Sequence, residues 1–473
     1  MKQRIPNQKR REALASPEVR QLRDHVIEAA RRVGRSRSAT GNEAPDLKDA
    51  ARRCAASVGM KLDAFWKASQ DAPEGPIDVI DMFSGCGGMS SGFRAVNGLV
   101  PAFRLAMAID VDRVANASYA RNLELTPREV DVSALAEDEA ELKRLIQSSR
   151  RREGNPLVLI GCAPCQGFSS HRNRAGASDG RNSLFVDFAK IASVLKPDAV
   201  VVENVPELLT NKYWSFVEEA RTILHASGYI VYLGVHNMAE FGVPQERFRA
   251  VMLALPRRFT PPRPILPTAK FRTVRQVIGG LPSIKAGERD RTDEMHYSAG
   301  HQPSTIETIR AVPADGGNRP RNVGPPCLRR AEERQGKAVY EDVYGRLFWD
   351  RPAITITAYA RNPASGRFVH PEQDRGLSVR EASLLQGFPS GYWFAGSLDE
   401  RFRQIGNAVP PIFSSYLAAY LLGEILGSPE PDVTMEPGIS KPIGLSFSRM
   451  IPGLKAKNRQ GNSSSSEALN RQN

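Results

Sequence analysis

Between residues 77 and about 255, short and mostly apolar runs alternate with segments of helical periodicity. Runs of four to six such residues, bounded by turn-forming residues, are typical of buried strands. Strands that alternate with helices predict βαβ units and a mainly parallel sheet, so the fold class is α/β. The expected strands are 77–81, 105–109, 157–160, 199–202, 230–235 and 249–254, and the expected helices are 89–95, 113–122 and 183–195.

The segments that flank this region have a different composition. Residues 1–75 are rich in Arg, Lys and Ala, and helical spacing of apolar residues predicts two helices there, one after Ser16 and one from about Asp46 to Val58. This basic extension either touches DNA or presents a solvated face, and both alternatives stay open.

The chain beyond the alternating region divides into three further parts. Residues 256–340 are rich in Pro and Gly and contain 16 Lys and Arg against 8 acidic residues, which suits a loop-rich module that reads DNA. An inert irregular region is the alternative. Residues 341–427 return to ordered patterning, with a capping box at Ser378 to Glu381, and residues 428–473 are predicted to be disordered. The core of the protein is therefore expected at 76–255.

Composition narrows the class of protein. The 473 residues include 41% hydrophobic ones, 65 Lys and Arg against 52 Asp and Glu, and a formal net charge of +13, which favours a polyanionic partner. Five cysteines without a pairing scheme indicate a reducing compartment and no disulfide framework. Since no window of eighteen apolar residues occurs, we expect a soluble, cytoplasmic protein with no membrane span.

Chemically reactive groups follow three of the expected strands. A glycine-rich turn at 83–88 follows the first strand, Cys162 and Cys165 follow the third, and Glu203 ends the fourth. The carboxyl ends of parallel strands meet at one edge of a sheet, so a thiol and a carboxylate are expected to face one pocket there.

The two cysteines also allow a plainer chemistry, because C-x-x-C can be a redox pair or half of a zinc site. The other cysteines are single, and no second ligand pair accompanies them, so no metal site is predicted. A thioredoxin-like pair would lie near the first strand rather than in mid-domain. For Cys162 we expect a small packing residue.

These motifs, taken in order, resemble the DNA (cytosine-5) methyltransferases. The resemblance covers about Ile77 to Leu422 and rests on eight segments: 81–88, 161–166, 203–205, 245–249, 344–347, 380–381, 385–389 and 403–411. It implies a Rossmann-like S-adenosylmethionine-dependent core with a mainly parallel sheet and a smaller, irregular target-recognition domain, here placed at 256–340. It also implies methylation of a cytosine flipped out of double-stranded DNA in a bacterial cytoplasm, where DNA binding would associate the protein with the nucleoid.

The resemblance assigns the reacting groups. C5 of cytosine is not nucleophilic until a group adds at C6, and a thiolate does this well. Cys165 corresponds to that nucleophile, Glu203 to the proton donor at N3, and Arg247 and Arg249 to the residues that hold the base and order the loop. These four are the expected catalytic residues.

The resemblance also implies a cofactor site for S-adenosylmethionine. Asp110 would accept the ribose hydroxyls, Val111 would lie beside the adenine, and Asp131 would bond the adenine amino group. For Asp131 a helix-capping carboxylate is the alternative. The remaining expected cofactor residues are Phe83, Ser84, Gly85, Gly87, Gly88, Val132, Pro164, Asn407 and Val409.

Three other functions deserve comparison with this one. A dinucleotide enzyme is disfavoured because the turn at 83–88 lacks the G-x-G-x-x-G spacing. Two alternatives remain: an enzyme that methylates cytosine in transfer RNA, and a catalytically silent DNA-binding homologue. The intact Cys165 and Glu203 disfavour the silent homologue. We expect a monomer, and a cognate restriction endonuclease that acts independently is a candidate partner.

Overall fold

The computed structural model describes residues 24, 48, 51, 59–163, 183–427 and 438–444. The chain divides into two compact units. The core unit comprises Met1–Asn237, Phe248–Ile265 and Pro411–Asn473, and the second unit comprises Met238–Arg247 and Leu266–Pro410. The second unit extends past residue 340 and takes in the segment around Arg247.

A six-stranded sheet forms the centre of the core unit, in the order β2-β1-β3-β4-β7-β5. β1, β2, β3 and β4 run parallel, whereas β7 is antiparallel to both of its neighbours. The six predicted strands are all confirmed, and the sheet is mainly parallel as expected. The bounds are β1 (Ile77–Met82), β2 (Phe103–Ile109), β3 (Leu157–Gly161), β4 (Ala199–Asn204), β5 (Ile230–Asn237) and β7 (Phe248–Leu255).

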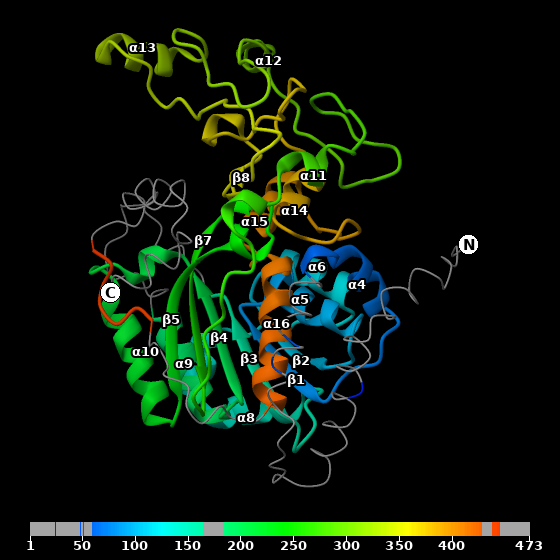
Figure 1. The fold of residues 1–473 in the computed structure, drawn as a ribbon, viewed down its shortest axis with the longest axis vertical. Coiled ribbons are helices and arrows are strands. Elements are labelled where there is room, and N and C mark those ends of the chain that lie inside the picture. The colour runs from blue at the N-terminus through cyan, green and yellow to red at the C-terminus, as the bar shows by residue number, and fades with distance from the viewer. Residues whose placement is uncertain are drawn as a thin grey trace. The chain divides into compact units, whose positions relative to one another are not determined.

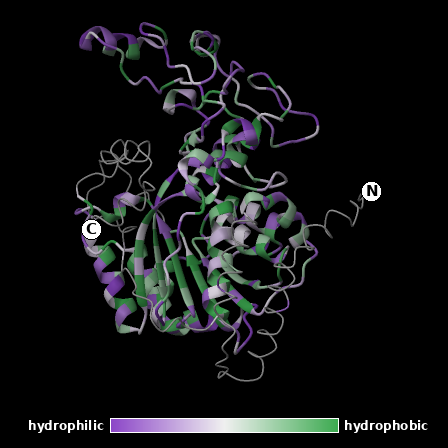
Figure 2. Ribbon diagram, in the orientation of Figure 1, coloured by the Kyte–Doolittle hydropathy of each residue, from purple (hydrophilic) through white to green (hydrophobic). Residues whose placement is uncertain are grey.

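Helices cover both faces of this sheet, and the apolar side chains of the strands are buried between them (Figures 1 and 2). On one face α5 packs against α16 and α4, and on the other α9 packs against α10 and α7. Ile80 and Met82 face the second group, so the alternate residue Asp81 points toward α5. The bounds are α4 (Leu62–Ser69), α5 (Gly88–Asn97), α6 (Arg113–Leu123), α7 (Val132–Glu137), α8 (Glu139–Gln147), α9 (Leu184–Leu195), α10 (Trp214–Ala226) and α16 (Pro411–Leu426).

The described part of the N-terminal extension is joined to the core. Lys48 forms a buried ion pair with Glu424 of α16 at 2.9 Å, their side chains being 3% and 1% exposed. Ala51 is fully buried, and it would lie 3.0 Å from a Cβ added at Gly423. Asp24, Lys48 and Ala51 are helical, within the two helices expected here, whereas α4 was not predicted.

The second unit contains little regular structure. Its elements are a two-stranded sheet of β6 (Gln245–Glu246) and β8 (Ala353–Ile354), and the helices α11 (Val274–Ile278), α12 (Pro303–Arg310), α13 (Pro326–Gln335), α14 (Val379–Leu385) and α15 (Leu398–Asn407). Buried arginines join its loops: Arg375 binds Glu381 at 2.7 Å, and the predicted capping box at Ser378 is present. A shortage of backbone ladders is thus offset by charge-assisted hydrogen bonds.

One prediction about the C-terminal segment is wrong. Residues 438–444 were expected to be disordered, yet they lie against the core unit, where the Ile439 N–H donates to Leu233 O at 2.7 Å. Ile439 is fully buried. Two isoleucines, Ile439 and Ile443, supply apolar surface that the composition of the whole tail obscures.

Among the described residues, the helical stretch Leu398–Leu426 is long and apolar enough to cross a membrane by composition. The protein itself buries 89% of its apolar window, which is typical of a core helix.

Candidate active site

The glycine-rich turn that follows β1 has an unusual backbone. Phe83, Gly85 and Gly87 have positive φ angles of 59°, 50° and 89°, and Gly87 is the N-cap of α5. Glycine adopts this region without strain, whereas a phenylalanine does not. A Cβ added at Gly85 would meet nothing within 4 Å, so the turn borders open space.

Asp110, directly after β2, is tied to this turn. Its Oδ2 accepts from the Gly85 N–H and its Oδ1 from the Asp112 N–H, both at 2.8 Å. Burial raises the pKa of Asp110 above its usual value, while these two N–H donors act in the opposite direction. Each oxygen keeps a lone pair for a further donor. The next residue, Val111, is 64% exposed, although it is a large apolar residue.

Asp81 lies below the turn in a buried hydrogen-bond chain that the sequence did not predict. The Tyr119 hydroxyl donates to Ser90 Oγ at 2.8 Å, and Ser90 Oγ donates to Asp81 Oδ2 at 2.5 Å. Burial, aided by the charge of Asp110, raises the pKa of Asp81 to about 7. Cys86 in the same turn is also buried, and burial raises the pKa of its thiol, so it remains a neutral packing residue.

Two further expected cofactor residues, Asp131 and Val132, lie at the start of α7. Asp131 is its N-cap, with Oδ1 accepting from the Ser133 N–H at 2.9 Å, so the capping alternative describes part of its role. The Val132 side chain belongs to the hydrophobic core and is 3% exposed. A cofactor contact at Val132 would therefore involve its main chain.

At the carboxyl ends of β3 and β4, Glu203 is held by two side chains. It is 2% exposed; Cys162 Sγ donates to its Oε2 at 3.0 Å, and Arg249 Nε lies 3.0 Å from its Oε1. The view of Cys162 as a packing residue is thus incomplete, because its thiol donates to the carboxylate. Next to Glu203, Asn204 donates to Ala163 O at 3.2 Å and so anchors the start of the cysteine loop.

Arg247 occupies a different environment from Arg249. It lies in the second unit, is 2% exposed, and donates to Ile356 O at 3.0 Å, to Gly406 O at 2.9 Å and to Ala408 O at 3.4 Å. Its guanidinium therefore joins the segment after β8 to the end of α15 through hydrogen bonds. A loop-ordering role agrees with this geometry.

Gln245 adds further hydrogen bonds between these segments. Its amide donates to Leu385 O and Gln386 Oε1, and its Oε1 accepts from the Ile356 N–H at 2.9 Å. Gln386 in turn donates to Ala408 O at 2.6 Å. Asn407 and Val409, two of the expected cofactor residues, flank Ala408 on this frame; Asn407 is exposed and Val409 is buried.

Two expected site residues, Pro164 and Cys165, lie outside the described residues. The described chain stops at Ala163 and resumes at Ser183. Among the described residues, no group of three or more His, Cys, Asp and Glu side chains is placed to hold a metal ion.

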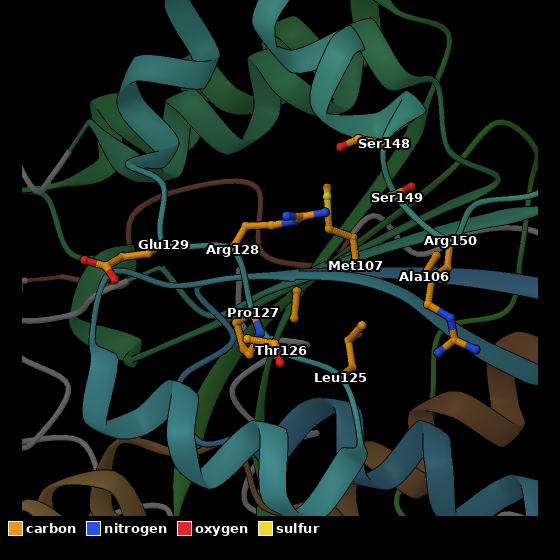
Figure 3. Close-up of a pocket in the computed structure, with 11 residues that line it drawn as sticks. Ala106, Met107, Leu125, Thr126, Pro127, Arg128, Glu129, Ser148, Ser149 and Arg150 are labelled. Atoms are coloured by element: carbon orange, nitrogen blue, oxygen red, sulfur yellow. The ribbon is translucent and has the colours of Figure 1, made fainter.

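A separate cavity of about 480 Å³ lies along the outer edge of β2 (Figure 3). The N–H groups of Arg128 and Arg150 donate to the edge carbonyls of Ala108 and Ala106 on either side of Met107. None of the expected site residues lines this cavity. Its lining residues are Ala106, Met107, Ala108, Leu125, Thr126, Pro127, Arg128, Glu129, Ser148, Ser149 and Arg150.

The chain is also similar in sequence and fold to known proteins. Residues 77–422 match the family described as C-5 cytosine-specific DNA methylase. The chain belongs to this family.

Characterised relatives cover nearly the same region. Type II methylase M.HgiDII of Herpetosiphon aurantiacus is 32% identical over 72% of this chain and 93% of its own length. Type II methyltransferase M1.HphI of Haemophilus parahaemolyticus is 31% identical over 73% of this chain and 87% of its own. A DNA modification methyltransferase encoded within an E. coli prophage has the same fold, with a TM-score of 0.55 and 23% identity over 73% of this chain and 98% of that one.

The protein is thus a DNA cytosine-5 methyltransferase of a family that depends on S-adenosylmethionine. The predicted fold class, a Rossmann-like methyltransferase core, is confirmed. Sequence reasoning missed Cys162 as a partner of Glu203, and it missed Ser90 and Tyr119 behind Asp81. The strand-end position of Cys162 was the available signal for the first, whereas no local pattern indicated the second.

Proposed function

We propose that this protein methylates C5 of cytosine within a specific sequence of double-stranded DNA, through covalent addition of the Cys165 thiolate to C6 of a flipped base. The observation that carries the proposal is Glu203, a carboxyl group 2% exposed at the end of β4, where the next residue, Asn204, donates to Ala163 O in the segment that leads to Cys165. Cys162 and Arg249 hold its two oxygens at this strand end, a polar arrangement that suits proton transfer.

The residues support each step of the addition. The thiolate electron pair forms the S–C6 bond, and the C5–C6 π electrons move toward N3 and O2. Glu203 donates a proton to N3, and Arg249 stabilises the carboxylate that remains. After C5 has taken the methyl group, N3 returns its proton to the Glu203 carboxylate, and the C5 proton is lost to water. The electron pair of the broken C5–H bond re-forms the C5–C6 double bond as the thiolate leaves C6.

The chain offers a suitable place for S-adenosylmethionine, which supplies the methyl group when it is bound. Asp110 keeps acceptor capacity beside Gly85, and the turn has open space where a side chain would project. Exposed Val111 provides an apolar surface for an adenine ring. Phe83, Ser84, Gly87 and Gly88 would shape the turn, and Asp131 and Val132 would lie beyond it. The resemblance also assigns Pro164, Asn407 and Val409 to cofactor binding.

The names of the relatives support a cellular role as well. One is named a Type II methylase and the other a Type II methyltransferase, names that point to restriction-modification systems. We therefore include in the proposal a cognate endonuclease that acts independently, and a monomeric methyltransferase located in the cytoplasm.

Bisulfite sequencing of DNA from cells that express the protein tests this function. Methylcytosine should appear at one short sequence and should disappear in cells that express Cys165→Ser, because a serine hydroxyl is too weakly acidic to add to C6. Glu203→Gln should reduce methylation strongly while keeping the size of the side chain.

The same experiment separates the other candidates. Methylcytosine in transfer RNA but not in DNA would identify an RNA enzyme. An unmethylated genome, together with tight binding of the protein to DNA, would identify a silent homologue. Full methylation by Cys165→Ser would refute the covalent mechanism.

A further inference from the structure

Tyr340 in the second unit combines two features that do not stabilise a fold. Its φ is 51°, in the left-handed region, and its side chain is 67% exposed. A bulky residue is strained at positive φ because its Cβ approaches the following carbonyl. An exposed aromatic ring also forgoes the benefit of burial. Strain of this kind persists where the surrounding structure imposes it, and it gathers at functional positions.

The chain before Tyr340 is fixed by a buried ion pair. Arg319 binds Glu332 at 2.5 Å, and both side chains are fully buried. Val339 bonds to both members of the pair, since its carbonyl accepts from Arg319 Nη2 at 2.9 Å and its N–H donates to Glu332. The backbone that leads into Tyr340 is therefore held on both of its polar groups.

The chain after Tyr340 is fixed as well. The Tyr340 carbonyl accepts from the Val343 N–H at 2.9 Å, and Arg367 binds Asp342 at 2.8 Å. Tyr344 is buried in a small apolar cluster, and its N–H donates to Pro363 O at 2.8 Å. Within the described part of the chain, the Tyr340 side chain itself makes no hydrogen bond or ring contact. The turn thus holds an exposed ring for which the described residues provide no hydrogen bond or ring contact.

The segment that carries this ring is basic. Between residues 321 and 342 the exposed cations are Arg321, Arg329, Arg330, Arg334 and Lys337, and the exposed acids are Glu333, Glu341 and Asp342, of which Asp342 pairs with Arg367. Three of the arginines lie on α13 (Figure 1). Where the structure describes the chain, none of these cations forms an ion pair. An exposed aromatic side chain that follows a run of unpaired cations in the sequence is typical of a nucleic-acid-binding segment.

We propose that Tyr340 is a DNA-contacting residue whose ring inserts at a base step of the duplex and stacks on a base there, while the cations that precede it in the chain bind the phosphates. This inference rests on the proposed function, because it takes duplex DNA as the substrate. The backbone holds the ring in place before binding, so little conformational freedom is lost when it stacks. The positive φ fixes the direction in which the ring projects, which explains why strain is retained at this position.

Binding by the full-length protein tests the inference. The probe is a fluorescent duplex that carries the site found by bisulfite sequencing, or a random-sequence duplex if no site is found. Tyr340→Gly removes the ring and also relieves the strain, so the melting temperature should stay equal or rise while Kd for the duplex rises about tenfold. Tyr340→Phe keeps the ring and should bind within about threefold of the wild type, since stacking involves the ring face.

Salt dependence distinguishes stacking from charge. Tyr340→Gly should weaken binding at every salt concentration without changing the slope of log Kd against log salt. The matched control Arg330→Ala should lower that slope by about one, as expected for one lost phosphate contact.

Two results would overturn the inference. Wild-type affinity of Tyr340→Gly would show that the ring does not touch DNA, and equal losses in Tyr340→Phe and Tyr340→Gly would assign the contact to the hydroxyl group. Failure of the proposed function is seen separately, as absence of methylcytosine in cells that express the wild-type protein.

Discussion

Two aspartates on β1 should respond in opposite ways to the same substitution. Asp78 and Asp81 are both buried, at 0% and 2% exposure. Asp78 pairs with the buried Arg104 and also accepts from the Arg152 N–H at 2.8 Å. Asp81 contacts the neutral hydroxyl of Ser90 instead. Asp81→Asn should therefore relieve the protein of a buried charge above about pH 7, whereas Asp78→Asn should leave Arg104 without a charged partner.

The size of the effect follows from the pKa of Asp81. Burial raises this pKa from 3.8 to about 7, so the folded state holds the proton more tightly than the unfolded state. Stability then falls as pH rises from about 4 to about 7, and the penalty stays constant above that range. At 1.36 kcal/mol per pH unit, the full penalty is about 4 kcal/mol.

Urea unfolding of the wild type and of Asp81→Asn, measured from pH 4 to pH 8, gives the difference in unfolding free energy between them at each pH. The side-chain amide of the variant is a buried donor without an acceptor. Leaving this donor unpaired destabilises the variant by about 1–3 kcal/mol at every pH. This constant cancels when the difference between variant and wild type is followed with pH. That difference should shift by about 4 kcal/mol in favour of the variant between pH 4 and pH 8.

Asp78→Asn is the control from the same strand, and it should destabilise the protein by about 3–5 kcal/mol at pH 8 because it breaks a buried ion pair. A difference between Asp81→Asn and wild type that does not change with pH would refute the reasoning. It would mean that Asp81 is ionised throughout the range and is stabilised by a charge.

Three shorter predictions concern other contacts. Lys48→Ala should lower the unfolding free energy by about 3 kcal/mol, because it breaks a buried ion pair, and the added change Glu424→Gln should recover part of the loss in urea unfolding. Asp110→Ala should weaken S-adenosylmethionine binding by about 1.5–3 kcal/mol in calorimetry, as expected for charge-assisted hydrogen bonds; unchanged affinity would move the cofactor site elsewhere. Cys162→Ala should keep at least about a tenth of the methylation rate, since one hydrogen bond to Glu203 contributes about 1 kcal/mol; a complete loss in a folded variant would assign the thiol a chemical step.

The strands and their ends could be predicted because their signal is local. Each apolar run marks a buried strand, and the parallel βαβ pattern brings the ends of β1 and β2 together. The contact between Gly85 and Asp110 therefore follows from topology, although the two residues are 25 positions apart. In contrast, α10 was missed because no capping or glycine signal marked its start, and α4 was missed because its amphipathic face is short.

The contacts of the second unit could not be predicted, since they join residues that are remote in sequence and lack periodic structure. Arg247 bonds to carbonyls 109 and 159 positions away. The motif containing Gln245 and Arg247 predicted functional arginines. The sequence alone did not show whether Arg247 would contact the base or bind backbone carbonyls of distant segments. Gly406 shows the same limit: an added Cβ would lie 2.2 Å from Ala358 N, so glycine is required by a distant segment.

The protonation of buried groups is the least predictable property, because it depends on partners from several elements. Asp78 and Asp81 look equivalent in the sequence, three residues apart on one apolar strand. Alternation places them on opposite faces, where Arg104 of β2 meets the first and Ser90 of α5 meets the second. One face thus supplies a cation and the other a hydroxyl, so the two carboxyl groups lie in different electrostatic environments. The group without a cation lies directly below the glycine turn and is coupled to Asp110, so a positively charged ligand in that turn would favour its ionised form.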